Sequence, residues 1–272
     1  LWRSLPAGDV YDMQTALFQP VGGMGRIGEA FGKELAPLIR YNAKVIDIRQ
    51  DEHGVGVTYT TSAGSTANAR ADWCLCTIPL AILAQIPMNV GPKMAAAISA
   101  VPYASAVKAG LQFKRRFWEE DERIYGGITY TDLPITNIGY PNCGYHGGGK
   151  GVLLGAYMFG LNAMEFTAMP LRERVQKIVE YGSQIHPQYT REFDNGITVG
   201  WHRMPSAMGC FGMWTPSTRQ RHYDDLCQID QRIALAGEHA SFLNGWQEGA
   251  VTSALDAVGR LHQRAVAAAR RA

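Results

Sequence analysis

Residues 233–255 read IALAGEHASFLNGWQEGAVTSAL and carry the strongest fold signal in the chain. A short apolar run predicts a strand that ends at Gly237-Glu238, and a loop follows it as far as Gly245-Trp246. Apolar residues then recur at helical spacing and predict one helix face, formed by Ala250, Ala254, Val258, Leu261 and Ala265. The stretch therefore predicts a strand–loop–helix unit.

The first turns of this predicted helix are thin, because Gly249, Ala250 and Ala254 have small side chains or none. A thin helix lets a planar ligand or another backbone come close. The helix start also carries unpaired N–H groups and about half a positive charge, which favours a group that becomes anionic. An ordinary strand–loop–helix connection would explain the same residues, so other segments have to decide between the two interpretations.

The composition indicates a globular, enzyme-like chain. Its 272 residues are 46% hydrophobic and its net charge is +2, which allows a core and gives no support for a nucleic-acid partner. We expect neither a membrane span nor a signal peptide, because apolar runs are short and Arg3, Pro6 and Asp9 interrupt the start. The compartment stays open. The scattered cysteines and histidines predict no metal site and no disulfide framework.

A second glycine-rich step precedes another predicted helix. Residues 19–27 read QPVGGMGRI, and the glycines after Pro-Val mark a tight backbone path. A helix is expected over about 25–38, because apolar residues follow at helical spacing: Met24, Ile27, Phe31, Leu35 and Leu38. Gly25 offers no side-chain acceptor, so the cap of this helix is left open.

The remaining patterns mix strands and helices. Strands are predicted at 43–48, 55–60, 71–79, 107–113 and 152–159. Gly91-Pro92 and Met169-Pro170 each open a predicted helix. The fold class we expect is α/β, with mixed α and β elements.

Taken together, these segments resemble the C-terminal portion of the flavin-dependent amine oxidase family. The L-amino-acid oxidase branch is the most similar, with its Ala-Gly-Glu strand end, its Gly-Trp helix start and a Pro-Val-Gly-Gly-Met segment like residues 20–24. The family has Asp where this chain has Gly25. The resemblance implies part of a two-domain FAD-dependent fold: residues 1–84 and 229–272 in the FAD domain, and residues 85–228 in a mixed-sheet substrate domain.

The resemblance also implies roles for single side chains, each with an ordinary alternative. Lys108 stands ten residues before Trp118, like the family lysine that holds a water against flavin N5, but it could be a solvated strand lysine. Tyr140 precedes Pro-Asn, like the tyrosine that holds the substrate carboxylate, but it could be a packing residue. Trp201 would wall the substrate pocket. Cys210 resembles the cysteine that binds FAD covalently in monoamine oxidases, but it could be a small buried thiol.

Contacts to the FAD cofactor are implied for Val45, Gly237, Glu238, Gly245, Trp246, Gln247 and Ala250. Val45 would meet the adenine end through its backbone, with a plain core valine as the alternative. Glu238 would bind ribityl or ribose hydroxyls. Gly245 and Trp246 would lie beside the substrate as well as the flavin.

The implied reaction converts an amino acid, dioxygen and water into a 2-oxo acid, ammonia and hydrogen peroxide. The cofactor accepts the hydride, and the protein binds and orients it. Three alternatives stay open: a monoamine or polyamine oxidase, an amino-acid 2-monooxygenase, and a non-catalytic subunit that docks to a flavin-bearing chain.

The family's dinucleotide fingerprint, Gly-x-Gly-x-x-Gly, does not occur in this sequence. We therefore expect a complementary N-terminal chain that carries the fingerprint, and a higher oligomer. The start at Leu1 rather than Met leads us to expect a processed piece of a longer oxidase.

Overall fold

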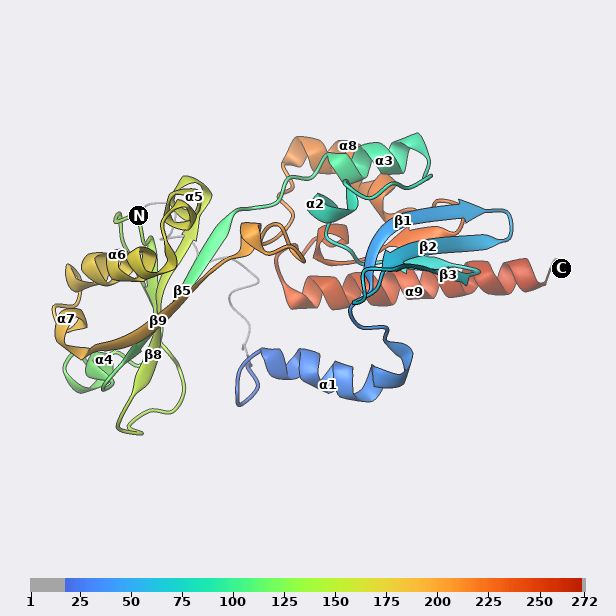
Figure 1. Ribbon diagram of the computed structural model, residues 1–272. Coiled ribbons are helices and arrows are strands. Elements are labelled where there is room, and N and C mark those ends of the chain that lie inside the picture. Colours follow the sequence, from blue (N-terminus) through green and yellow to red (C-terminus); the bar gives the residue numbers. More distant parts are fainter. Residues whose placement is uncertain (1–17, 271–272) are drawn as a thin grey trace.

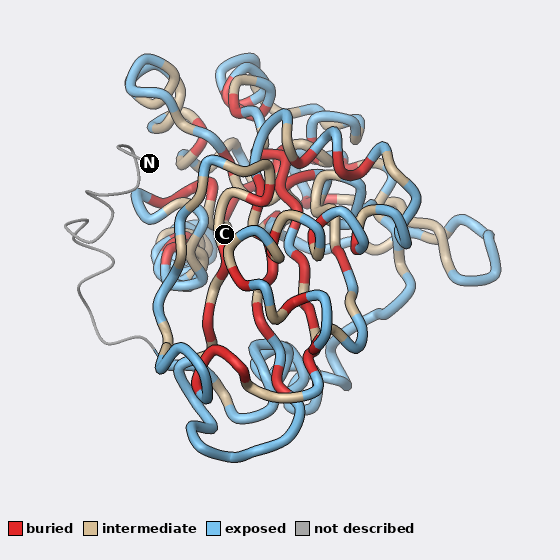
Figure 2. The backbone as a smooth tube through the Cα atoms, turned by 90° about the vertical axis from the view of Figure 1, so that its left-hand side faces the viewer, coloured by how far each residue is buried: buried red, intermediate tan, exposed pale blue. Residues whose placement is uncertain are grey.

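The computed structural model describes residues 18–270 and arranges them in two lobes (Figure 1). The first lobe holds β1–β4, β10, α2, α3, α8 and α9, and the second holds β5–β9 and α4–α7. Buried backbone runs through both lobes (Figure 2). The predicted mixture of helices and strands is confirmed.

The first lobe contains an antiparallel three-stranded sheet in the order β1 (Lys44–Asp51), β2 (Gly54–Thr60) and β3 (Thr66–Ala71). The β1–β2 turn is tight because the Asp51 carboxylate accepts the backbone N–H groups of His53 and Gly54 at 2.8 and 3.0 Å. The predicted strands at 43–48 and 55–60 are therefore confirmed as a hairpin.

A parallel pair, β4 (Cys74–Cys76) and β10 (Ile233–Leu235), lies beside this sheet. The Cys74 N–H donates to the Arg232 carbonyl at 2.9 Å, and the Ala236 N–H donates to the Cys76 carbonyl at 3.0 Å. Both bonds lie on the β10 side of β4. Its other edge pairs with no strand among the described residues. Parallel strands normally belong to larger, covered sheets, so this edge is an unfinished one.

Helices close the first lobe around its core. They are α2 (Leu80–Leu83), α3 (Pro92–Ser99), α8 (Pro216–Cys227), the 3₁₀ turn η5 (Glu238–Ala240) and the long α9 (Gln247–Ala269). Helices α3 and α8 lie side by side (Figure 1). Met94, Ile98 and Leu226 on these helices are buried in one cluster with Ile233 and Leu235 of β10.

The second lobe is built on a five-stranded antiparallel sheet. Its order is β6 (Ile128–Tyr130), β7 (Asn137–Gly139), β8 (Gly151–Phe159), β5 (Ala106–Phe113) and β9 (Phe193–Gly200). The helical elements around it are α4 (Phe117–Glu120), α5 (Gly160–Ala168), α6 (Leu171–Ser183), α7 (Tyr189–Glu192) and η4 (Trp201–Arg203). Phe113, Phe117, Trp118 and Tyr189 are fully buried and pack edge-on or tilted in its core. The predicted strands at 107–113 and 152–159 are confirmed.

Two chain segments join the lobes, and they run antiparallel to each other. The Ala104 N–H donates to the Phe211 carbonyl at 3.0 Å, and the Cys210 N–H donates to the Ala104 carbonyl at 2.8 Å. The Met213 N–H donates to the Pro102 carbonyl at 2.8 Å. The chain therefore enters and leaves the second lobe through one hydrogen-bonded ribbon.

The buried face of α9 lies one position before the predicted apolar face. The buried residues are Gly249, Ser253 and Ala257, all small, because η5 and β10 pack closely against them. The larger side chains Val251, Leu255 and Val258 are more than half exposed. Ala250 and Ala254, which belong to the predicted face, are only half-buried.

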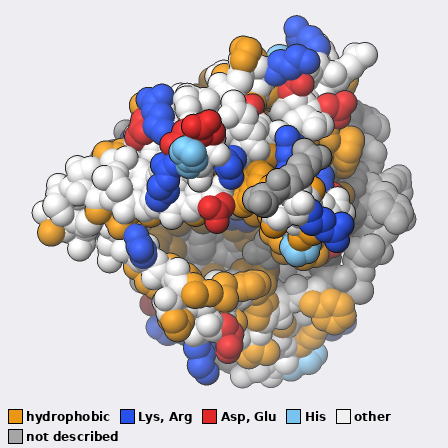
Figure 3. All heavy atoms as spheres, turned by 90° about the vertical axis from the view of Figure 1, so that its right-hand side faces the viewer, with side chains coloured by type: hydrophobic (Ala, Val, Ile, Leu, Met, Phe, Trp, Pro, Cys, Tyr) orange, Lys and Arg blue, Asp and Glu red, His pale blue; other side chains and the backbone are white. Residues whose placement is uncertain are grey.

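The predicted helix at 25–38 consists of α1 (Gly25–Leu35) and a 3₁₀ turn, η3 (Ala36–Leu38). No α1 residue is buried against the part of the chain that the structure describes. Its apolar residues, Ile27, Phe31 and Leu35, are 37%, 61% and 41% exposed. Figure 3 shows hydrophobic side chains gathered in the lower part of the view, at the height where Figure 1 places α1. This helix has an apolar face without a partner among the described residues.

The predicted ranges 1–84, 85–228 and 229–272 stay predictions as domains, and residues 1–17 lie outside the described part. The boundary between the two hydrophobic cores does not coincide with these ranges. It lies at the ribbon around residues 102–105 and 209–213. Helices α3 and α8 fall inside the range predicted for the substrate domain, yet their buried residues belong to the core of the first lobe.

Candidate functional site

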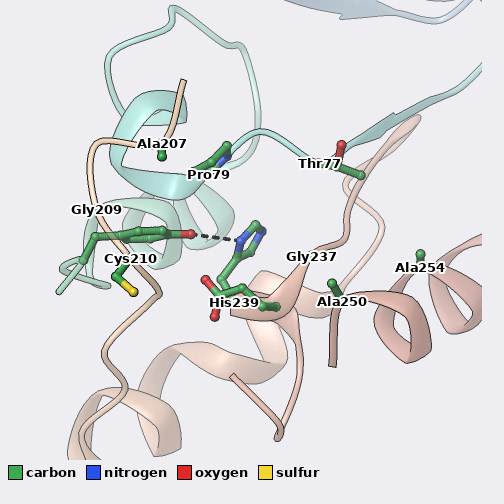
Figure 4. A pocket seen from close by; sticks show the side chains of 11 residues that line it. Thr77, Pro79, Ala207, Gly209, Cys210, Gly237, His239, Ala250 and Ala254 are labelled. Carbon is green, nitrogen blue, oxygen red and sulfur yellow. Dashed lines mark hydrogen bonds between the residues drawn. The ribbon is translucent and has the colours of Figure 1, made fainter. Parts of the chain in front are cut away.

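A hollow of about 320 Å³ lies where the ribbon meets β4, η5 and α9 (Figure 4). Small residues form most of its wall, which consists of Thr77, Pro79, Tyr103, Ala207, Gly209, Cys210, Gly237, Glu238, His239, Ala250 and Ala254. Ala250 and Ala254 come from the first turns of α9, and their small side chains leave room for the hollow. The wall thus combines both ends of the predicted strand–loop–helix unit with the return segment from the second lobe.

The backbone at Gly237 turns sharply into the hollow. Its φ is 139°, a conformation that favours glycine, and a Cβ there would come within 2.7 Å of His239 Cε1. The Gly237 N–H donates to Ser253 Oγ of α9 at 3.2 Å. The strand end is thereby fixed against the helix.

The Glu238 carboxylate is occupied by two backbone donors. Oε1 accepts the Gly212 N–H and Oε2 accepts the Gly245 N–H, each at 2.9 Å. Burial raises the pKa of Glu238, and hydrogen bonds from the two amides and Tyr103 oppose that shift. Both carboxylate oxygens are thus already bonded within the chain.

A half-buried tyrosine and a buried histidine form a pair that covers one side of the hollow (Figure 4). The Tyr103 hydroxyl accepts the Leu80 N–H at 3.2 Å and lies 3.1 Å from Nδ1 of His239. Burial lowers the pKa of His239 to about 4, so its ring is neutral at physiological pH.

Lys108 lies beside Tyr157, which is its partner across the β5–β8 ladder. Lys108 Nζ stands 4.5 Å from the centre of the Tyr157 ring, and the Tyr157 hydroxyl lies 3.7 Å from Cys210 Sγ. Burial and the neighbouring Cys210 raise the pKa of Tyr157, so its hydroxyl keeps its proton. These contacts connect Lys108 to the wall of the hollow.

Tyr140, predicted to hold a substrate carboxylate, does not lie with this group. Its side chain is in the core of the second lobe and is 7% exposed. Its hydroxyl bonds to Thr129 Oγ1 at 2.9 Å and to His186 Nε2 at 2.5 Å. The placement favours the packing alternative, because the polar end of Tyr140 is already bonded inside the lobe, and the carboxylate role stays a prediction.

Trp201 and Val45 lie outside the wall of this hollow. Trp201 is half-buried in η4, and its indole N–H has no hydrogen-bond partner among the described residues. Val45 lines a neighbouring hollow of about 1060 Å³, which shares Pro79 with the first. Val45 also packs against the first core, so its two predicted roles do not exclude each other.

The other predicted contacts gather at the start of α9. Trp246 is the half-buried residue before the helix, Gln247 is exposed, and Ala250 lines the hollow. The Gly245 N–H donates to Glu238, so only the carbonyl of Gly245 stays available to a ligand. No side chain caps α9, which leaves its first N–H groups for a bound group.

Residues of the site that were not predicted include Tyr103, Tyr157, Phe211 and His239. The aromatic rings of Tyr157, Phe159 and Phe211 form a short row next to Cys210, with centroid distances of 4.4 and 6.3 Å. The sequence contained one usable signal, the adjacency of His239 to Glu238. The position of Tyr157 depends on a strand register that no local motif encodes.

The residues present fit an FAD cofactor in part. The hollow is at the lower end of the range for small-molecule pockets, about 300–1,000 Å³, so it suits a ring system rather than a whole dinucleotide. Its small-residue wall and uncapped helix start fit the edge of a flavin. Cys210 lines the hollow, and its thiol contacts Tyr157. Its covalent role remains a prediction.

Residues 18–270 contain no group of three or more His, Cys, Asp or Glu side chains arranged to hold a metal ion. None of their helices combines the length and the apolar character that crossing a membrane requires.

Residues 8–262 match the sequence profile of the family described as flavin containing amine oxidoreductase. The L-amino-acid oxidase of Vipera ammodytes ammodytes is 31% identical over 261 residues, which cover 94% of this chain and 53% of that protein. The L-amino-acid oxidase of Bothrops pauloensis is 32% identical over 263 residues, with 94% and 51% covered. The chain therefore spans about half the length of the curated relatives it matches.

Solved structures of amine oxidases share the fold. Cyclohexylamine oxidase from Brevibacterium oxydans IH-35A superposes with a TM-score of 0.76 at 16% identity, covering 89% of this chain and 53% of that one. Putrescine oxidase bound to putrescine gives 0.73 at 15% identity, with the same coverage. These likenesses extend across both lobes.

Proposed function

Because this chain belongs to the flavin-containing amine oxidoreductase family, we propose that it is the C-terminal half of an FAD-dependent L-amino-acid oxidase. The reaction is amino acid, dioxygen and water to 2-oxo acid, ammonia and hydrogen peroxide. The bound flavin supplies the electron acceptor. The observation that carries the proposal is the Lys108–Tyr157–Cys210 group at the edge of a hollow walled by the start of α9.

In this proposal the residues of this chain bind and orient the substrate and the flavin. Lys108 holds a water by hydrogen bonding at the reacting face, and Trp246 borders the substrate. The Tyr157 hydroxyl is protonated and its ring faces the Lys108 ammonium, so this hydroxyl suits a substrate carboxylate as its hydrogen-bond partner. A carboxylate contact favours an amino acid over a plain amine, and the relatives above 30% identity are L-amino-acid oxidases.

Tyr157→Phe should raise the KM for amino acids about 10-fold, because a hydrogen bond to a charged group is lost. Its kcat should change less. An amine without a carboxylate should be unaffected by the change. Steady-state assays of peroxide release over both substrate classes measure the difference.

Tyr140→Phe is the matched control, since it also removes one tyrosine hydroxyl. It should leave KM unchanged and cost about 1 kcal/mol of stability, because the buried bonds to Thr129 and His186 are lost. The reverse pattern, a KM effect at Tyr140 and none at Tyr157, would return the carboxylate to Tyr140.

The proposed partner is an N-terminal half that carries the Gly-x-Gly-x-x-Gly fingerprint. Three surfaces support it: the open edge of β4, the apolar face of α1, and the exposed Val251, Leu255 and Val258 of α9. A strand of the partner would extend the β4–β10 pair, and Thr77 at the end of β4 would then bring the following loop to the hollow.

Reconstitution tests the function and the partner together. Co-expressed with the corresponding N-terminal half of an L-amino-acid oxidase, the chain should co-purify, show the visible flavin absorption band and release peroxide from amino acids. The chain alone should be colourless and inactive. A yellow, active preparation of the chain alone would disprove the half-site proposal, and a coloured pair that is inactive on every amino acid would support a docking subunit.

Phe31→Asp sharpens this experiment. A charge on the apolar face of α1 should weaken co-purification, because it would be buried unpaired in the interface. Lys33→Asp, two residues further along the same exposed helix, is the matched control and should co-purify normally.

A further inference from the structure

We propose that Glu238 is a positioning residue, whose carboxylate bridges the loop 209–212 to the loop 244–246. This carboxylate bridge consists of the two 2.9 Å hydrogen bonds from Gly212 N–H to Oε1 and from Gly245 N–H to Oε2. An ionised carboxylate is acceptor-only and has an oxygen for each amide. A glutamine side chain has one oxygen, so it would place an NH₂ group against one of the two N–H donors.

A second set of contacts joins the same loops. Asn244 Nδ2 donates to the Gly212 carbonyl at 2.9 Å. The Phe211 ring packs directly on Gly245, where a Cβ would come within 3.3 Å of Cγ of that ring. The carboxylate bridge therefore adds to a direct packing contact between the two loops.

The loop 244–246 is also held from outside by Arg219. Its guanidinium lies 4.8 Å from the ring centres of Tyr223 and Phe242 and 5.4 Å from that of Trp214. It donates to the Ser241 carbonyl at 3.3 Å and to Asn244 Oδ1 at 3.4 Å. With this side anchored, the carboxylate bridge fixes where the loop 209–212 can lie.

The bridge links the two halves of the candidate site. The loop 209–212 carries Cys210, which contacts the Tyr157 hydroxyl of the second lobe. The loop 244–246 leads directly into α9, whose first turns wall the hollow. The catalytic consequence rests on the proposed function: the bridge sets the distance between the Lys108–Tyr157 side and the start of α9.

Stability and positioning can be separated at this residue. Burial raises the pKa of Glu238, so an ionised carboxylate at this position costs folding free energy. Replacing a buried charge with a neutral group of similar shape is therefore tolerable for the fold, even when one hydrogen bond is lost. Glu238→Gln should accordingly melt close to the unsubstituted chain while loosening both loops.

Amide hydrogen exchange of the full 272-residue chain tests the bridge without any cofactor. In Glu238→Gln, peptides covering 209–214 and 242–247 should both exchange about 10-fold faster, because a charge-assisted bond is lost between them. Peptides from α8 and β5 should not change. Glu248→Gln, an exposed glutamate at the start of α9, is the matched control and should leave both loops as they are.

Unchanged exchange in both loops, or faster exchange confined to residues 237–240, would overturn the proposal. If circular dichroism shows that Glu238→Gln does not fold, Asn244→Ala takes its place. It removes the parallel tie to the Gly212 carbonyl and should loosen the same two loops together.

The reconstituted enzyme supplies the functional readout. Glu238→Gln should retain flavin, lose about 10-fold in kcat and change KM little, because a shifted loop misplaces the reacting groups. Loss of flavin with normal exchange would instead make Glu238 a direct ligand of the cofactor and overturn the bridge. If the unsubstituted pair is inactive, the proposed function fails, while the exchange experiment still decides the bridge.

Discussion

Lys108→Met is expected to lower kcat/KM of the reconstituted oxidase about 100-fold or more. Methionine keeps the length and the apolar stem of the side chain but removes the ammonium that stands 4.5 Å from the Tyr157 ring. Without it, no group on β5 orients a water at the reacting face or supports the protonated Tyr157 hydroxyl. Rapid anaerobic reduction of the flavin by substrate, followed by its absorbance, measures the step directly.

Lys114→Met is the control for this change. Lys114 directly follows β5, is exposed, and donates to the Arg191 carbonyl at 2.8 Å in the far part of the lobe. Its replacement should leave reduction unchanged. Equal rates in Lys108→Met and the unsubstituted enzyme would show that Lys108 is a solvated strand lysine.

Gly249→Ala should have the largest effect on stability, about 3 kcal/mol, which lowers the Tm by roughly 10 °C. A Cβ at this position would lie 2.1 Å from the Leu243 carbonyl oxygen and 2.8 Å from Ser241 Oγ. The nearest of these is backbone, so the loop before α9 would have to move away from the helix. Thermal unfolding followed by circular dichroism measures the shift.

Gly259→Ala tests the same substitution in the same helix where nothing crowds the site. No atom lies within 4 Å of its added Cβ, so alanine should stabilise the helix by about 0.5–1 kcal/mol. Opposite signs at the two positions are the expected result. A neutral Gly249→Ala would mean that the loop 241–243 yields without cost.

Local sequence patterns predicted the helices and strands well. They predicted less well which face of a helix is buried. The small residues at the start of α9 predicted a close approach, and the Leu243 backbone makes it at Gly249. The buried face of α9 nevertheless lies one position before the predicted apolar face. Periodicity selects the larger apolar side chains, whereas the packing against η5 and β10 admits only Gly249, Ser253 and Ala257.

Site residues were predictable where their partners are close in sequence. Glu238 and Gly245 are seven residues apart and were both predicted. Tyr157 was missed because it meets Lys108 only through the β5–β8 register, which a bulge shifts at Ala109/Gly110. The burial of Tyr140 in the second lobe could not be predicted for a related reason. Its Pro-Asn context gives no sign that His186, distant in sequence, occupies its hydroxyl.

The ribbon between the lobes makes the second lobe an insertion into the first. Residues 104 and 211, where that lobe begins and ends, are hydrogen-bonded neighbours. Segments with adjacent ends can be gained, lost or exchanged without breaking their host. Evolution can therefore replace the strands of the second lobe, which meet the substrate in the proposed function, while β4, β10 and α9 stay as they are. Two proteins could then share one flavin-binding wall and oxidise different molecules.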